Sequence, residues 1–245
     1  MENVLAVAAA SVATAFCGAL VASHLQRPRP HAAVWSVAMG MYALATWALA
    51  WGLIAGWGGA VFRVFYLFGA ILNVMYLALG AVFLVGGRRA GAVLLVVFSA
   101  FGAGASAVTL TASFVAALPV TGVPAGSEVF AEMSEGLATP RLWALVGNVV
   151  GTVLLVGFAI YTVVRTRKAN RRIAAGNGLI VGGAVAPALG GSLTGFGEGG
   201  FLALSLLIGA GMLWAGYRTA SGAGVKVGGG AAGVPLDQRA GHPPG

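Results

Sequence analysis

Hydrophobic and polar positions divide the chain into seven long apolar segments joined by polar connectors. A helix that crosses a bilayer needs about 20 mainly apolar residues, which each segment supplies. The pattern therefore predicts an all-α membrane protein folded as a bundle of seven transmembrane helices. The expected spans are residues 3–23, 32–56, 60–86, 91–118, 142–164, 173–195 and 199–217.

The third segment has a polar and aromatic stripe along one side. Residues three or four apart share a face of a helix, and one face here carries Phe62, Tyr66, Gly69, Asn73, Tyr76, Gly80 and Phe83. The opposite face is aliphatic, with Val64, Leu67, Ile71, Ala78, Val82 and Val85. Helices in lipid turn aliphatic side chains outward and polar or small residues toward other helices. We therefore expect the Tyr, Asn and Gly stripe to face the bundle interior.

Composition and charge placement refine this picture. The chain is 59% hydrophobic and 8% charged, with a mean hydropathy of +0.92, whereas a soluble domain carries about 25% charged residues. All but Arg63 and Arg141 of the 14 Lys and Arg residues fall on one side of the predicted bundle. The positive-inside rule then places the amino terminus outside and the carboxyl terminus in the cytoplasm. The net charge of +8 is thus explained by topology, without a nucleic-acid partner.

The chain is expected to form one bundle over residues 1–218, followed by a flexible cytoplasmic tail over residues 219–245. The tail is rich in Gly, Ala and Pro and lacks the apolar residues needed to build a core. Residues 77–89 (LALGAVFLVGGRR) also resemble residues 206–218 (LLIGAGMLWAGYR). This similarity is consistent with a three-plus-one-plus-three repeat of the kind found in transporters, or with chance matches in a Gly-rich chain.

The one long external connector, residues 120–140, is predicted to contain a short helix. Ser127 is suited to cap it, with Val129, Phe130, Met133 and Leu137 on a shared face. Such a helix would lie over the outer mouth of the bundle, either as an ordered surface loop or as a functional lid.

Several polar residues within the spans are candidates for binding a ligand. They are Tyr66, Asn73, Tyr76, Asn148 and Asn177, which could line a cavity suited to an uncharged or amphiphilic molecule. The default alternative is packing, because small and weakly polar residues also let helices approach closely and bond to one another. Pro187 is expected to kink or locally unwind the sixth helix, and could serve gating there.

The sequence offers little support for catalysis or for a cofactor. No Asp, Glu, His, Lys or Arg lies in the middle of a span, and the last helix has no lysine for a retinal Schiff base. Paired histidines for haem and a Ser/His or paired Asp arrangement for proteolysis are missing from the spans. We expect a protein that is not an enzyme and that holds no metal or other cofactor.

Three motifs carry a resemblance to other proteins: FYLFGAILNVMYLALG in the third segment, GNVVGTVLLV in the fifth and GNGLIVGGA in the sixth. With these motifs the chain resembles uncharacterised seven-helix integral membrane proteins of high-GC actinobacteria. The resemblance implies a multi-pass protein of a bacterial plasma membrane and brings no established activity. The chain also faintly resembles the seven-helix sensory modules of some histidine kinases.

Two functional hypotheses follow. In the first, the bundle binds or passively passes an uncharged or amphiphilic small molecule or lipid through a cavity formed by helices three, five, six and seven. In the second, the protein is a sensor or accessory subunit that contacts a cytoplasmic protein partner, a second copy of the chain or anionic lipid. The contact residues in the second hypothesis are Arg165, Arg167, Lys168, Arg171 and Arg172.

Overall fold

A computed structural model describes the chain except for residues 120–121, 167–170, 194–198 and 223–245. The described part is helical, and seven segments are long and apolar enough to cross a membrane, which confirms the predicted number of spans. The spans are α1 (Glu2–Gln26), α2 (Pro30–Ala55), α3 (Gly59–Phe65) continuing through η1 (Tyr66–Leu72) into α4 (Asn73–Val85), α5 (Gly87–Thr111), α7 (Pro140–Thr166), α8 (Arg171–Leu193) and α9 (Gly199–Gly222).

Two boundaries differ from the prediction. The fourth span, α5, ends at Thr111 rather than near residue 118, and Ala112 has already left the helical conformation. The last helix continues to Gly222, so the first residues of the predicted tail are helical. The rest of that tail lies outside the described residues.

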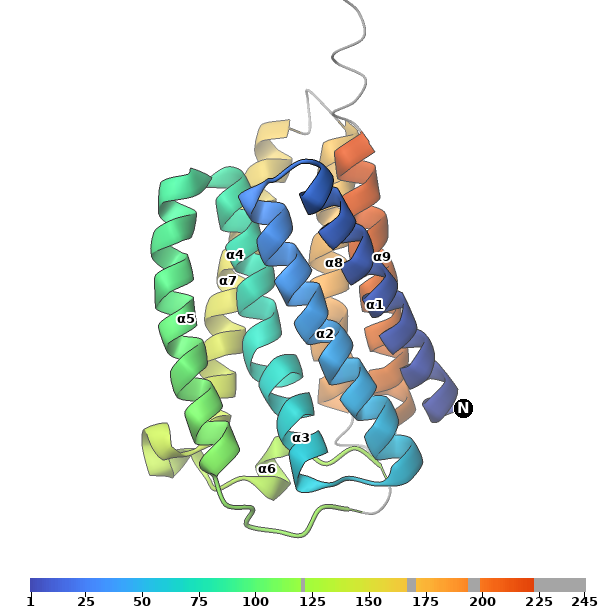
Figure 1. Cartoon of the computed structure of the whole chain (residues 1–245), viewed down its shortest axis with the longest axis vertical. Helices are drawn as coiled ribbons and strands as arrows, with labels where there is room; N and C mark the ends of the chain where they lie inside the picture. The colour runs from blue at the N-terminus through green and yellow to red at the C-terminus, as the bar shows by residue number, and fades with distance from the viewer. Residues whose placement is uncertain (120–121, 167–170, 194–198, 223–245) are drawn as a thin grey trace, which may run out of the picture.

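The spanning helices stand side by side in one bundle (Figure 1). The amino terminus lies at the end that holds the long connector over residues 112–139, which we name the loop end. We name the opposite end, where α5 begins and where α1, α7 and α9 finish, the basic end, because the sequence near these helix ends contains Arg27, Arg88, Arg165 and Arg218. In this view α5 forms one edge and α1 the other, while the third span lies between them.

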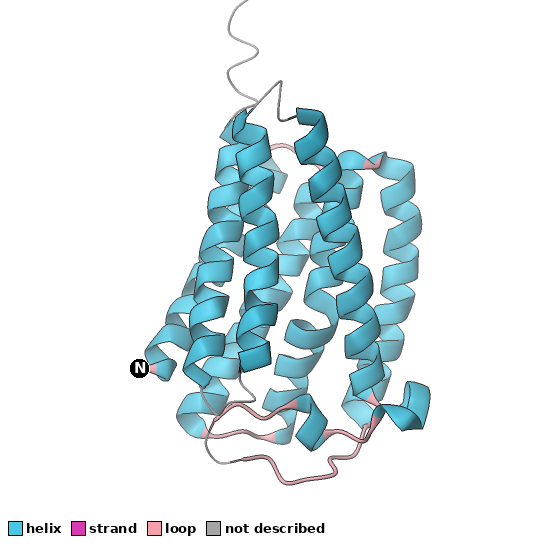
Figure 2. Ribbon diagram, turned by 180° about the vertical axis from the view of Figure 1, so that it is seen from behind, coloured by secondary structure: helices cyan, strands magenta, loops and turns pink. Residues whose placement is uncertain are grey.

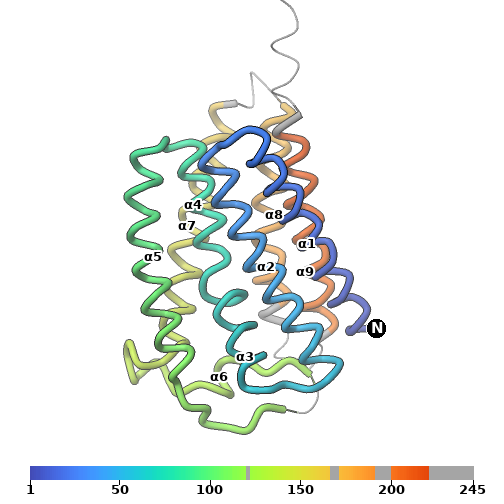
Figure 3. Tube along the Cα trace, viewed as in Figure 1, coloured from blue at the N-terminus to red at the C-terminus, as the bar shows by residue number. Residues whose placement is uncertain are grey.

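The third span is not a uniform α-helix. Residues Tyr66–Leu72 form a π-helical segment between α3 and α4, visible as a widened turn in the trace (Figure 3). π-Helical turns are rare in proteins as a whole, and those that occur are often located at functional sites. A helical wheel of constant period cannot predict such a turn, because it assumes the same rotation for every residue.

The aliphatic face of this span does not face lipid, contrary to the sequence-based expectation. Leu67, Ile71, Ala78 and Val82 are all buried. The reason is that α2 packs on one side of the span while α5 and α7 cover other sides. The third span is therefore an internal helix of the bundle.

Helix α7 approaches the third span through two glycines. A Cβ atom on Gly151 would lie 2.8 Å from the Met75 nitrogen, and one on Gly147 would lie 2.5 Å from the Ile71 carbonyl oxygen. Close contact of backbones through small residues is a common way for helices to pack in membranes. The two glycines flank Asn148, so the contact also brings the Asn148 side chain to the π-helical segment.

A second glycine contact joins α8 to α9. Gly176 and Gly183, seven residues apart on α8, face Gly216 and Gly209 on α9. A Cβ on Gly183 would lie 2.7 Å from the Gly209 carbonyl oxygen and 2.8 Å from the Leu213 nitrogen. The two helices can lie this close together because these four glycines have no side chains.

This contact leads to a stability prediction. Gly183→Ala should lower the free energy of unfolding by about 1–3 kcal/mol, because the new methyl group meets backbone atoms that can move only if the helices separate. The control is Gly178→Ala on the same helix, where a Cβ meets no atom within 4 Å. Alanine there should be neutral or slightly stabilising. Thermal unfolding in one detergent compares the variants, and equal melting temperatures would contradict the packing described.

The long connector forms two short helices rather than the single one predicted. They are α6 (Gly126–Val129) and the 3-10 helix η2 (Met133–Ala138), and the residue that precedes α6 as its cap is Ala125, not Ser127. Val129 and Phe130 are buried, with 1% of each exposed, whereas Met133 and Leu137 are 45% and 70% exposed. The expected shared face is wrong because the chain turns between the two helices.

The connector is attached to the bundle by aromatic and polar contacts. Phe130 packs on Phe62, Tyr66 and Phe114, and the Trp57 ring nitrogen donates a hydrogen bond to the Gly122 carbonyl at 2.7 Å. Arg63 donates to the carbonyl oxygens of Thr109 and Ala112 at the end of α5 and lies 4.5 Å from the centre of the Phe114 ring. These contacts hold residues 122–130 over the loop end of the third span.

Candidate functional site: a cavity beside the π-helical segment

A cavity of about 510 Å³ lies in the loop-end half of the bundle. Its volume is within the range of about 300–1,000 Å³ that is typical of small-molecule sites. The walls come from α2, the third span, α7, α8, α9 and the connector. The lining residues are Tyr42, Ala45, Phe65, Tyr66, Gly69, Ala70, Asn73, Val74, Val123, Pro124, Ala125, Gly126, Asn148, Thr152, Ala184, Val185, Pro187, Ala188, Leu202 and Leu206.

The described lining is mostly apolar and carries no charged side chain. The polar groups are the amides of Asn73 and Asn148, the hydroxyl of Thr152 and the phenol groups of Tyr42 and Tyr66. A mainly apolar pocket with few polar groups is the usual form of a site for an uncharged ligand.

The predicted ligand-binding residues divide into two groups. Tyr66, Asn73 and Asn148 line the cavity, and so does Pro187. Tyr76 does not: its hydroxyl lies on the α5 side of α4, 3.9 Å from where a Cβ of Gly102 would stand. Asn177 is also elsewhere, because its amide nitrogen donates at 2.9 Å to the Ile173 carbonyl within α8, near the basic end.

The two asparagines of the cavity are anchored by the same kind of bond. The Asn73 amide nitrogen donates to the Ala38 carbonyl of α2 at 2.8 Å. The Asn148 amide nitrogen donates to the Ala70 carbonyl, inside the π-helical segment, at 2.6 Å and to the Ala144 carbonyl at 2.9 Å. Asn73 and Asn148 therefore tie α2, the third span and α7 together around the cavity.

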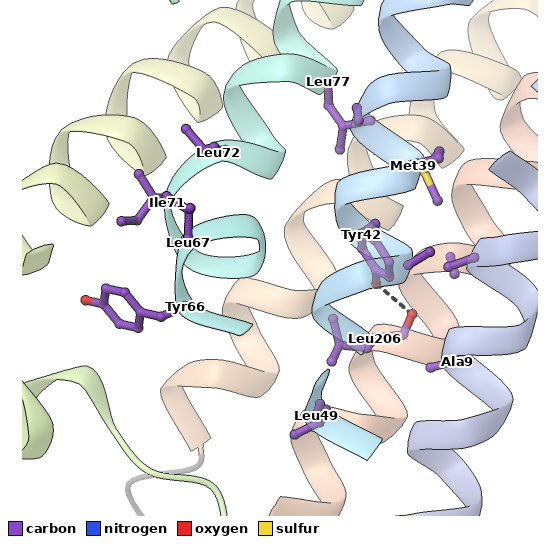
Figure 4. Close-up of a cluster of buried hydrophobic side chains, with 14 of the residues drawn as sticks. Ala9, Met39, Tyr42, Leu49, Tyr66, Leu67, Ile71, Leu72, Leu77 and Leu206 are labelled. Atoms are coloured by element: carbon purple, nitrogen blue, oxygen red, sulfur yellow. Dashed lines mark hydrogen bonds between the residues drawn. The ribbon is translucent and has the colours of Figure 1, made fainter. Parts of the chain in front are cut away.

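Tyr42 is a cavity residue that the sequence analysis missed. Its ring is buried, and its hydroxyl donates to the Leu206 carbonyl of α9 at 2.7 Å (Figure 4). The ring of Tyr66 points away from Tyr42 in the same view and lies against Gly126 of the connector. A signal for Tyr42 was present, since a tyrosine in the middle of an apolar span must place its hydroxyl on a partner.

The basic-end side of the cavity is closed by a layer of large apolar side chains. One or two turns beyond the lining residues, each surrounding helix contributes one member: Met39, Leu77, Leu155, Ile180 and Leu213. A void of about 20 Å³ remains among them, room for about one water molecule. The Trp35 ring, whose nitrogen donates to the Leu77 carbonyl at 3.1 Å, fills the space nearer the basic end.

The side of the cavity between α7 and α8 is less enclosed. Thr152 of α7 and Ala188 of α8 both line the cavity and are also exposed. Seen from behind, α7 and α8 lie together at the basic end and diverge toward the loop end (Figure 2). This side of the cavity, between α7 and α8, is therefore the candidate route by which a ligand would enter.

Pro187 lies within α8, which is helical from Arg171 to Leu193. The locally unwound segment that we considered for this helix is therefore not observed. The Pro187 ring is close to α9, with its Cδ 3.3 Å from where a Cβ of Gly209 would stand. Its part in gating stays a prediction.

The candidate contact residues for a partner lie at the basic end. Arg165, Arg171 and Arg172 are exposed there, and Arg165 bonds to the Tyr161 hydroxyl. Arg167 and Lys168 lie outside the described residues. Within the described ranges no group of three or more His, Cys, Asp or Glu side chains is placed to hold a metal ion.

Comparisons with protein-family models, with curated proteins and with solved structures find no match to this chain.

Proposed function

We propose that this chain is a multi-pass membrane protein that binds an uncharged or amphiphilic small molecule in the cavity beside Asn73 and Asn148. The observation that carries the proposal is the cavity of about 510 Å³ whose described lining is apolar apart from neutral polar groups. An ionic ligand would lose its hydration shell there without gaining a counter-charge. A neutral ligand avoids that cost.

The positive-inside rule supports an orientation with the basic end in the cytoplasm and the loop end outside. The cavity then lies in the outer half of the membrane, and its α7–α8 side faces the lipids of the outer leaflet. The proposal does not depend on a three-plus-one-plus-three repeat, because it rests on the residues that line the cavity. A bacterial plasma membrane fits the same proposal.

Binding fits the geometry better than passage through the bundle. The layer formed by Met39, Leu77, Leu155, Ile180 and Leu213 separates the cavity from the basic end. Passage of a ligand through the bundle would require these five side chains to move apart. The same layer also supports the second hypothesis, in which the protein is a sensor or accessory subunit. A receptor binds its ligand without passing it through the bundle. In that case Arg165, Arg171 and Arg172 at the basic end would contact the partner that responds to the bound ligand.

The test of binding is native mass spectrometry of the gently solubilised protein. Wild type should carry a co-purified small molecule or lipid, and Asn73→Ala and Val185→Phe should lose most of it. Val185 lines the cavity, so a phenylalanine there occupies the space of the ligand. The matched control is Leu189→Phe one turn along α8, where the side chain is 64% exposed. A bare wild-type protein, or equal ligand on both phenylalanine variants, would contradict the proposal.

A further inference from the structure

The two cavity asparagines are oriented in the same way. Each amide nitrogen faces backbone carbonyl oxygens: Ala38 for Asn73, and Ala70 and Ala144 for Asn148. A carbonyl oxygen can only accept hydrogen bonds, so the side-chain oxygen cannot take the place of the nitrogen. In both residues the oxygen Oδ1 is therefore directed away from these bonds.

Neither Oδ1 atom has a hydrogen-bond donor among the residues that the structure describes. Within the same ranges, the only fully enclosed side-chain polar atom without a partner is Thr109 Oγ1, so both asparagine oxygens are accessible. Asn73 is 6% exposed and lines the cavity. The space that its oxygen reaches is therefore the cavity itself.

An unpaired carbonyl oxygen in an apolar site is unfavourable, because it has given up water without gaining a donor. The Asn148 amide nitrogen bonds to Ala70, one turn before Asn73 on the third span, so the two asparagine side chains lie on the same wall of the cavity. Thr152, one turn along α7 from Asn148, is exposed and lines the same space. The opposite wall, with Ala184, Val185 and Leu202, offers apolar contacts.

We infer that the ligand of this cavity is a neutral single-chain amphiphile whose hydroxyl donates its one hydrogen bond to Oδ1 of Asn73, the more buried of the two asparagines. Its apolar part lies against α8 and α9 and extends toward the bilayer between α7 and α8. The inference rests on the proposed binding function and adds the chemistry of the ligand. A carboxylate would be repelled by the two oxygens, and an ether or ester of the same length would leave them unpaired.

The test uses three matched probes with the wild-type protein in lipid nanodiscs: 1-dodecanol, dodecyl methyl ether and dodecanoate. Native mass spectrometry counts the bound probe across a titration. The alcohol should bind about five- to tenfold more tightly than the ether, as expected for one hydrogen bond, and dodecanoate more weakly than both. 1-Propanol, which has the hydroxyl without the chain, should not compete at equal concentration.

The other possible outcomes distinguish failure of the hydrogen-bond inference from failure of the proposed binding function. Equal affinity for alcohol and ether, with loss of both on Val185→Phe, would keep the cavity as a binding site and overturn the hydrogen-bond inference. Preferential binding of dodecanoate would also overturn that inference. If none of the chain-bearing probes binds, or if Val185→Phe binds them as wild type does, the proposed binding function fails as well.

A variant tests the assignment to Asn73 separately. Asn73→Leu should reduce affinity for the alcohol to that for the ether while leaving the ether within about twofold of wild type, because the shape is nearly kept and the acceptor is lost. Leu189→Phe, on the lipid-facing side of α8, should retain the full preference for the alcohol. An Asn73→Leu protein that unfolds the same as wild type and keeps the preference would overturn the role of Asn73.

Discussion

Gly151→Leu is expected to lower the free energy of unfolding by about 3 kcal/mol or more. A Cβ at this position would stand 2.8 Å from the Met75 nitrogen and 2.9 Å from the Val74 carbonyl carbon, both backbone atoms of α4. Neither can rotate away, so α7 must move off the third span. In a chain of this size the loss corresponds to a fall of about 6–12 °C in melting temperature.

The control for this prediction is Gly157→Leu on the same helix. A Cβ at Gly157 meets no atom within 4 Å, and the position is exposed. Its effect should stay within about 0.5 kcal/mol. Thermal unfolding of the three proteins in one detergent makes the comparison. If both leucine variants unfold like wild type, the close contact of α7 with the third span is wrong.

Asn148→Leu is expected to be the next most damaging change and to act on the π-helical segment. The substitution removes the donor to the Ala70 carbonyl, which lies inside Tyr66–Leu72. A buried carbonyl that loses its partner costs about 1–3 kcal/mol. Hydrogen exchange of residues 66–76 should become faster, because α7 no longer restrains this turn.

The matched change is Asn177→Leu. It also removes a hydrogen bond from an asparagine to a carbonyl, but that bond is to Ile173 within the same helix. It should leave the exchange of residues 66–76 as in wild type. Equal exchange of this segment in the two variants would show that Asn148 does not hold the π-helical turn.

The sequence predicted the seven spans because each one must satisfy its backbone hydrogen bonds within an apolar run of limited length. It also indicated Asn73 and Asn148 as candidate ligand-binding residues, and an amide inside a span must find a partner. Both are bonded to backbone carbonyls of neighbouring helices.

The arrangement of the site was harder to predict because it depends on contacts between helices. Tyr76 was placed with Asn73 by helical spacing, but it lies on the flank toward Gly102 of α5. The aliphatic face with Ile71 was expected in lipid, and α7 covers it through Gly147. Neither the π-helical turn nor the packing of α7 against it leaves a periodic signal in the sequence.

The cavity is also a product of packing rather than of any one segment. Tyr42 comes from α2 and bonds to α9, while Val123 and Pro124 of the connector close the loop end. Sequence spacing relates residues within one helix, and these residues belong to different parts of the chain.

The central claim is that the loop-end half of the bundle holds a neutral ligand between Asn73, Asn148 and the α8–α9 wall. The most direct test is an experimental structure of the wild-type protein, purified in its native lipids and bound to an antibody fragment, at a resolution that shows side chains. The account predicts density for a ligand in contact with the Asn73 oxygen. A structure in which α7 packs on α8 along its whole length, with side chains filling the space beside Asn73, would contradict it.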